Sequence, residues 1–301
     1  MTAQVLIDAF RLPAQALVAQ RIPKKLLVEQ GAPTAADKRL INDTIDELWW
    51  QATLKPGTVG VPAFHAATVP ATPATAPAAG TGSAADGASD GGAASAHATD
   101  ATEAADVIEL ALVSAHLRPP TREAQARRLM QLIHRAIPYP VLLVTQAPSG
   151  TVLSVAHKRA SQGEAGKWVV ADGADTHAFN PAQPTTAETE FMASLALQQL
   201  PPSALADLRA LYQAVADRIT ALAVAQVTGH FKAPEAATAA PAARTAAQRQ
   251  ALAERSRLLD QLASARSTAA KARQMSQRVE LNLQIQRLLR QLQEIQEGLA
   301  T

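Results

Sequence analysis

The chain has 301 residues, a formal net charge of +2, 3% aromatic residues and no cysteine. The lack of cysteine excludes disulfides, a thiol nucleophile and cysteine-ligated zinc, and it agrees with a cytoplasmic location. No stretch reaches the roughly 18 consecutive apolar residues of a membrane span, and no signal peptide is visible, so we expect no membrane association.

The first structured region is predicted over residues 1–64. Thr34 can cap a helix, with Asp37 three residues later. Apolar residues then recur at helical spacing, at Leu40, Ile41, Ile45, Leu48 and Trp49. We expect this helix to end near residue 54 and a short strand to follow over residues 58–61.

Residues 65–105 form an insertion rich in alanine, threonine, proline, glycine and serine. Val69 is its one large aliphatic side chain, so the segment cannot bury enough apolar surface to offset the entropy of ordering. We expect this insertion to be disordered.

The body is predicted to resume over residues 106–180. The pattern predicts a strand, a helix, a hairpin and a further strand, at residues 107–117, 122–136, 141–155 and 167–171. The run VLLVT within the hairpin is typical of a strand that is covered on both faces. This order indicates an α+β fold, with a small mixed or antiparallel sheet and flanking helices.

Helical segments are predicted to complete the chain. Residues 185–230 form a helical region split at Pro201-Pro202, and residues 231–243 are a linker. Residues 244–301 contain no proline, and no glycine before Gly298, which predicts one long coiled-coil helix. This segment has ten basic and five acidic residues, a net charge of +5, which leaves −3 for the rest of the chain.

Two apolar seams run along this predicted C-terminal helix. The first has Leu258 and Leu262 followed by three alanines at the same alternating spacing. The second contains only large aliphatic residues, Leu281, Ile285, Leu288, Leu292, Ile295 and Leu299. The heptad spacing is typical of a coiled coil, and the seams are two residues out of phase, so the contact face must change around residues 273–280. The seams fit a partner protein, a second copy or the chain's own body, and they do not fix the oligomeric state.

Two basic clusters are candidates for binding phosphate or nucleic acid, Lys24 with Lys25 and the run His157, Lys158 and Arg159. The structural alternatives are an exposed helix start for the first cluster and a solvated strand end for the second.

Trp49-Trp50 is a candidate surface for stacking on a base. Trp49 shares the predicted helical face with Ile45 and Leu48, which favours core packing for it.

Catalytic patterns are absent from the sequence. It contains no phosphate-binding glycine loop, no nucleophile elbow and no zinc-protease motif, so we assign no catalytic residue, no metal and no cofactor. A metal-dependent nuclease would need closely spaced acids and a lysine on adjacent strands. The nearest such residues are Asp106, Glu109, Glu164 and Lys167, and their spacing is loose.

Several short motifs occur in a specific order, namely Ile22-Pro23-Lys24-Lys25, Asp37-Lys38, Trp49-Trp50, IHRAIPYPVLL at 133–143, His157-Lys158-Arg159 and VELN at 279–282. With these motifs the chain resembles the uncharacterised bacterial family known as domain of unknown function 4391. The resemblance covers the chain except the insertion and residues 180–245. It implies no established activity. Family members tend to be encoded beside helicase-like and DNA methyltransferase genes of restriction or phage-defence type, which implies such subunits as partners.

From these observations we expect a non-enzymatic accessory or assembly subunit that acts through its C-terminal helix. A direct nucleic-acid-binding module is the alternative, and a metal-dependent nuclease is the least favoured hypothesis.

Overall fold

The computed structural model describes residues 2–66, 106–160, 168–234, 239–272 and 274–300. Its centre is a six-stranded sheet whose neighbouring strands follow chain order. Only β3 and β4 run parallel, and every other adjacent pair in this described sheet is antiparallel. The strands are β1 (Leu17–Arg21), β2 (Ile45–Leu54), β3 (Leu110–Leu117), β4 (Val141–Ala147), β5 (Gly150–Ala160) and β6 (Trp168–Asp175). The predicted α+β class with a mixed sheet and flanking helices is confirmed.

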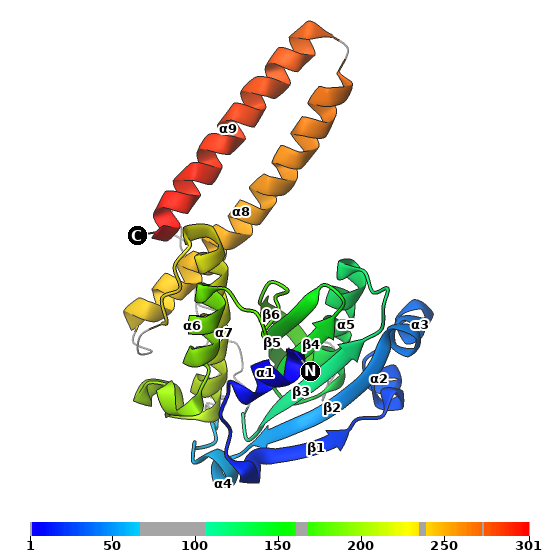
Figure 1. Ribbon diagram of the computed structural model, residues 1–301, viewed down its shortest axis with the longest axis vertical. Helices are drawn as coiled ribbons and strands as arrows, with labels where there is room; N and C mark the ends of the chain where they lie inside the picture. Colours follow the sequence, from blue (N-terminus) through cyan, green and yellow to red (C-terminus); the bar gives the residue numbers. More distant parts are fainter. Residues whose placement is uncertain (1, 67–105, 161–167, 235–238, 273, 301) are drawn as a thin grey trace, which may run out of the picture.

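Helices cover both faces of the sheet (Figure 1). One apolar core joins the sheet to α1 (Thr2–Asp8), α6 (Thr186–Ser194) and α7 (Leu208–Thr228). A second core joins the opposite face to α2 (Lys24–Gln30), α3 (Ala35–Thr44) and α5 (Glu123–Ala136). Short 3₁₀ helices at Ala14–Ala16, Leu197–Gln199 and Pro202–Leu205 join the longer elements.

Strand β3 shows how one sequence serves both cores. Successive side chains of a strand point to opposite faces. Leu110 and Leu112 therefore lie in the first core, while Ala111 and Val113 lie in the second. Strand β4 has the same double burial, which is why its sequence is a continuous apolar run rather than an alternating one.

Helix α5 is the crossover that the parallel pair β3 and β4 requires. The predicted apolar side of this helix is buried in the second core. On its other side, Arg128 donates from Nε and Nη2 to the two carboxylate oxygens of Asp37 in α3, over 2.9 and 3.0 Å. Thr34 caps α3 as predicted, since its hydroxyl oxygen accepts from the Asp37 amide over 3.1 Å.

Two predictions for the first 64 residues are wrong. The helix expected over residues 34–54 ends at Thr44, and residues 45–54 form β2 instead. Strand β2 gains hydrogen bonds from β1 on one side and β3 on the other, and this pairing overrides the helical spacing of its apolar residues. The strand expected over residues 58–61 is replaced by a helical turn, α4 (Pro56–Val59), which ends at Gly60 with a φ of 72°. The edge strand β1 was not predicted.

The C-terminal segment is a helical hairpin and not one continuous helix. Helix α8 (Ala239–Lys271) ends before residue 272, and α9 (Met275–Ala300) runs back beside it (Figure 1). The predicted boundary at residue 244 also moves, because α8 begins at residue 239. The two seams face each other, with Leu258, Leu262 and Ala265 of α8 packed against Leu288 of α9. The phase break between the seams marks the place where the chain reverses.

The hairpin is fixed to the body at its base, through α7. Arg249 of α8 donates to Asp217 over 2.7 Å between Nη2 and Oδ1, and to the Thr220 hydroxyl over 3.3 Å. From this base the hairpin projects away from the sheet (Figure 1). No helix in the described ranges is long and apolar enough to cross a membrane. The predicted disordered insertion lies outside the described residues, except for residues 65 and 66.

Candidate functional site

Lys24 and Lys25 stand together at the start of α2 but have different surroundings. Lys25 is exposed and pairs with Glu29, with 3.6 Å between Nζ and Oε1. Lys24 donates from Nζ to the carbonyl oxygen of Ile45 at the start of β2. Pro23 leads the chain from β1 into α2 and so sets the position of Lys24. Of the two lysines, Lys24 lines a pocket.

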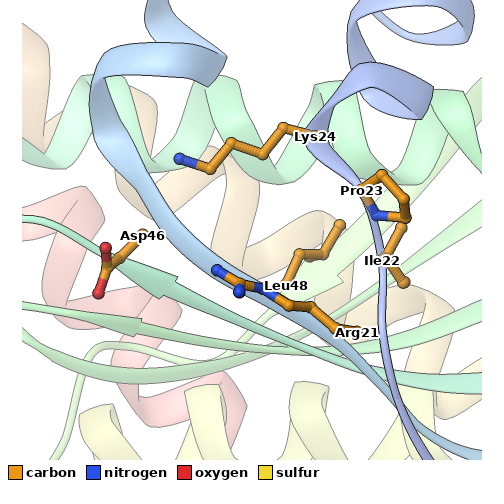
Figure 2. A pocket seen from close by; sticks show the side chains of 6 residues that line it. All are labelled: Arg21, Ile22, Pro23, Lys24, Asp46 and Leu48. Atoms are coloured by element: carbon orange, nitrogen blue, oxygen red, sulfur yellow. The ribbon is translucent and has the colours of Figure 1, made fainter.

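This pocket opens where β1 ends beside β2. Its volume is about 390 Å³, and it is lined by Arg21, Ile22, Pro23, Lys24, Asp46 and Leu48. Figure 2 shows the Arg21 guanidinium and the Lys24 ammonium both directed toward the side of the pocket that holds Asp46. A volume of this size is in the range of small-ligand sites. We call it the Arg21–Lys24 pocket.

Charged groups of both signs surround the Arg21–Lys24 pocket. Arg118, which follows β3, holds Asp46 with 3.1 Å between Nε and Oδ1, and Arg21 lies 3.7 Å from Glu47. Burial lowers the pKa of Lys24, and the Arg118 guanidinium lowers it further. Arg118 and Arg21 are thus each paired with a carboxylate. The third cation, Lys24, can donate a charge-assisted hydrogen bond to an anionic group such as a phosphate.

The face of β2 opposite to the side on which Leu48 lines this pocket carries a polar surface. Trp49 in β2 lies opposite Arg21 of β1 and opposite Ser114 of β3. Its indole Nε1 donates to Glu47 Oε2 over 3.1 Å. Next to it, Gln51 Nε2 donates to the Ser114 hydroxyl over 2.8 Å. We call this surface the Trp49 face.

The prediction that Trp49 packs in the core with Ile45 and Leu48 is wrong. Those two residues belong to the second apolar core, and among the described residues neither apolar core of the body includes Trp49. In a strand, Trp49 must point away from the side that Leu48 occupies. Trp50 does pack against the second core, and its ring meets Tyr139 edge to face at 6.4 Å between centroids.

Lys158 lies elsewhere, on β5. Its ammonium donates to the carbonyl oxygens of Ile137 and Tyr139, just after the end of α5. Burial lowers the pKa of Lys158 to about 7, whereas the two carbonyl acceptors favour its charged form. Cations commonly satisfy the free carbonyls at a helix C-terminus, so Lys158 has a structural role. The side chains of His157 and Arg159 lie outside what the structure describes.

His134 and Ser154 form a buried polar pair between α5 and β5. His134 Nε2 lies 3.0 Å from the Ser154 hydroxyl oxygen. Burial and, to a lesser extent, the charge of Lys158 lower the pKa of His134 to about 3. The imidazole is therefore neutral. With no access from solvent, the pair holds α5 on the sheet and offers no surface to a substrate.

The predicted coiled-coil residues lie inside the hairpin. Leu258, Leu262, Leu288 and Leu299 are buried, and the partly buried Ile285, Leu292 and Ile295 pack against the hairpin core. Leu281 is half-buried.

A second set of apolar residues on the hairpin was missed. Met275, Val279, Leu283 and Leu289 of α9 are 73%, 51%, 50% and 43% exposed. At about 100° per residue they span roughly 120° of the helix surface, on the side away from α8. We call them the outer face of α9. A sequence signal existed, because 275, 279 and 283 recur every four residues.

Two of the acids considered for a nuclease, Asp106 and Glu109, are engaged by neighbouring side chains. Asp106 pairs with His65 over 3.1 Å, and Glu109 pairs with Lys55 over 2.8 Å. Glu164 and Lys167 lie outside the described residues. Within the described ranges, no three His, Asp or Glu side chains gather closely enough to hold a metal ion.

The family of the chain follows from comparison with family models. The model described as domain of unknown function (DUF4391) matches residues 10–69 and 99–292, which include the sheet and nearly all of the hairpin. The chain belongs to this family. The DUF4391 match thus confirms the resemblance seen in the short motifs. No curated protein and no solved structure matches the chain.

Proposed function

We propose that this DUF4391 chain is a non-enzymatic assembly subunit that binds a protein partner on the outer face of α9. The observation that carries the proposal is the apolar stripe at Met275, Val279 and Leu283. These residues stay exposed after the hairpin has closed its own core. Exposed apolar patches of this kind mark interaction sites in soluble proteins.

The chemistry of the partner follows from the charges around the stripe. Arg278, Arg287 and Arg290 are exposed on α9, and the C-terminal segment as a whole has a net charge of +5. A partner surface that combines apolar and acidic side chains would complement both features. An acidic amphipathic helix laid along α9 fits this description.

The family resemblance suggests where such a partner is encoded. Helicase-like and DNA methyltransferase subunits of restriction or phage-defence systems are the candidates, because their genes tend to lie beside those of family members. This step rests on genomic context and not on the chemistry of any residue.

The test is co-purification with the products of the neighbouring genes. The full chain, a chain lacking residues 245–301 and a V279S/L283S variant are each expressed with those genes. We expect the full chain to retain one partner in stoichiometric amount and both altered chains to lose it. The matched control is L17S/V18S, which changes two exposed apolar residues of β1. Equal partner recovery with V279S/L283S and the control would contradict the proposal.

A second candidate function is direct binding of nucleic acid, and the observation that favours it is the Arg21–Lys24 pocket. Phosphate contacts release condensed counterions, so binding should weaken steeply as salt is raised. Electrophoretic shifts over a salt series provide the test, with R21A expected to bind more weakly than K25A. The absence of a shift at low salt would reject this function.

A further inference from the structure

We propose that the partner of the C-terminal hairpin is an acidic amphipathic helix that docks on one particular side of the hairpin, where it contacts both α8 and α9. This side is marked by two exposed leucines, Leu259 of α8 and Leu289 of α9, and we call it the Leu259–Leu289 side. The inference rests on the proposed function and deepens it. It adds α8 to the docking surface and states which side of the hairpin the partner occupies.

The first argument is that Leu259 and Leu289 lie on the same side of the hairpin. Each of them directly follows a leucine of the hairpin core, Leu258 in α8 and Leu288 in α9. One step along a helix turns the side chain by about 100°, and so away from the core. The two helices face each other and run in opposite directions (Figure 1), so this step leads to the same side of the pair in both of them.

The second argument is that this side keeps apolar surface next to the hairpin core. Leu259 is 39% exposed and Leu289 is 43% exposed. Ile285, one helical turn before Leu289, packs against the hairpin core and is only partly buried. Ala263, one turn after Leu259, is exposed and small, so a partner helix can approach α8 closely. A helix on this side packs against two helices at once, and it therefore buries more apolar surface than a helix that lies along α9 alone. Because Leu289 also belongs to the outer face of α9, the two surfaces are continuous.

The third argument is the charge of this side. Residues that are four, seven or eleven positions away from Leu259 or Leu289 lie on the same side of their helix. These positions include Arg255, Arg266 and Arg278. None of the acidic residues among the described residues of α8 and α9 occupies such a position. The Leu259–Leu289 side is therefore both apolar and positively charged.

The opposite side of the hairpin carries charges of both signs. Glu254 pairs with Arg257 there, with 2.7 Å between Oε1 and Nη2. Glu280 lies on the same side of α9 as Arg287, two helical turns further along the helix. An acidic helix is thus attracted to the Leu259–Leu289 side more strongly than to the opposite side. A second copy of this chain is disfavoured as the occupant, because it would bring the same arginines against each other.

The first test is photo-crosslinking to the neighbouring-gene product that co-purifies with the full chain. A photoreactive side chain replaces Leu259 in one chain and Gln261 in a matched chain. Gln261 is exposed on the same helix, and two steps of about 100° place it on the opposite side of the hairpin. We expect position 259 to crosslink to that product and position 261 to give no crosslink. No crosslink from position 259, or an equal yield from both positions, would overturn the inference.

The second test compares charge reversals on the two sides of the hairpin. The variants are R266E/R278E on the Leu259–Leu289 side and R257E/R287E on the opposite side, and both change the net charge by the same amount. We expect R266E/R278E to weaken binding of the same purified product about 10-fold or more, because like charges then oppose each other across the interface. R257E/R287E should stay within about 3-fold of the unaltered chain. Circular dichroism checks that both variants keep their helices, and equal weakening by the two variants would overturn the inference.

Failure of this inference is distinguishable from failure of the proposed function. If V279S/L283S loses the partner while position 259 gives no crosslink, the outer face of α9 remains the docking site and α8 takes no part in it. If V279S/L283S retains the partner, or if no neighbouring-gene product co-purifies with the full chain, the proposed function fails and this inference fails with it.

Discussion

The α/β body and the C-terminal hairpin bury their apolar side chains in different ways. The body has two cores on the two faces of one sheet, and side chains such as Leu112 and Leu129 are fully buried. The hairpin has one seam between two helices, and even Leu258, the best-buried residue of that seam, keeps 4% of its surface exposed. The exposed apolar side chains of the body, such as Leu17 and Ile108, lie on different segments, whereas four such side chains lie along one side of α9. The hairpin is therefore the region where a partner adds most to burial.

The largest effect is expected in the body, at Phe191. This side chain is fully buried and meets Phe179 and Phe231 edge to face. Phe191→Ala should lower the free energy of unfolding by about 3–5 kcal/mol, because it removes burial and leaves a cavity. Leu283→Ala on the outer face of α9 should change it by less than about 0.5 kcal/mol. Urea unfolding of both variants gives the comparison, and similar losses would break the contrast between the two regions.

A smaller and local effect is expected for the hairpin seam. Leu262→Ala should cost about 2 kcal/mol, the lower end of the range for a buried leucine, because the two-helix seam can partly collapse. The loss should fall on the hairpin alone. Amide hydrogen exchange should become faster in α8 and α9 and stay unchanged in β3 and β4. Faster exchange throughout the sheet would show that the regions fold as one unit.

The body should also carry a pH dependence that the hairpin lacks, through His134. Burial lowers the pKa of His134 to about 3, against about 6.5 in an unfolded chain. As pH falls below about 6.5, His134 becomes protonated in the unfolded chain but stays neutral in the native chain. The free energy of unfolding therefore falls, by about 1.4 kcal/mol per pH unit at most. His134→Asn should flatten the profile between pH 6.5 and 5. Parallel profiles for the two chains would show that His134 is not the cause.

A small effect on stability is expected for Asp37. Hydrogen bonds from Arg128, and then from Thr34, lower the pKa of Asp37 to about 2. A lowered carboxyl pKa contributes stability that is complete above about pH 4 and lost as pH falls toward 2. Because Arg128 is 44% exposed, we expect Asp37→Asn to cost only about 1 kcal/mol at neutral pH. Asp46→Asn, which breaks the more exposed pair with Arg118, is the control and should cost less.

Sequence patterns predicted most of the sheet from β3 to β6, because β3 and β4 are long apolar runs and α5 between them has a clear buried side. They failed at β2, where Ile45 and Leu48 fit a helical spacing and partners distant in sequence decide the outcome. They also missed β1, an edge strand whose five residues are all exposed and carry no burial pattern.

The candidate sites were predicted less completely. Lys24 was identified from its place after Pro23, but Arg21 and Asp46 reach the same pocket only because β1 and β2 pair. The error at Trp49 follows from the error in secondary structure. In a helix, Trp49 would lie near the face that Leu48 occupies, whereas in a strand the two side chains point to opposite faces. The two seams were predicted as contact surfaces of one continuous helix, whereas the structure packs Leu258 and Leu262 of the first seam against Leu288 of the second. The phase break between the seams coincides with the turn of the chain.

Photo-crosslinking from position 283 tests the central claim most directly. A photoreactive side chain replaces Leu283, and in a control chain it replaces Leu17, with both chains expressed beside the neighbouring genes. We predict that position 283 gives one crosslinked species with a neighbouring gene product and that position 17 gives none. The account is contradicted if position 283 gives no intermolecular crosslink while the partner still co-purifies with the chain.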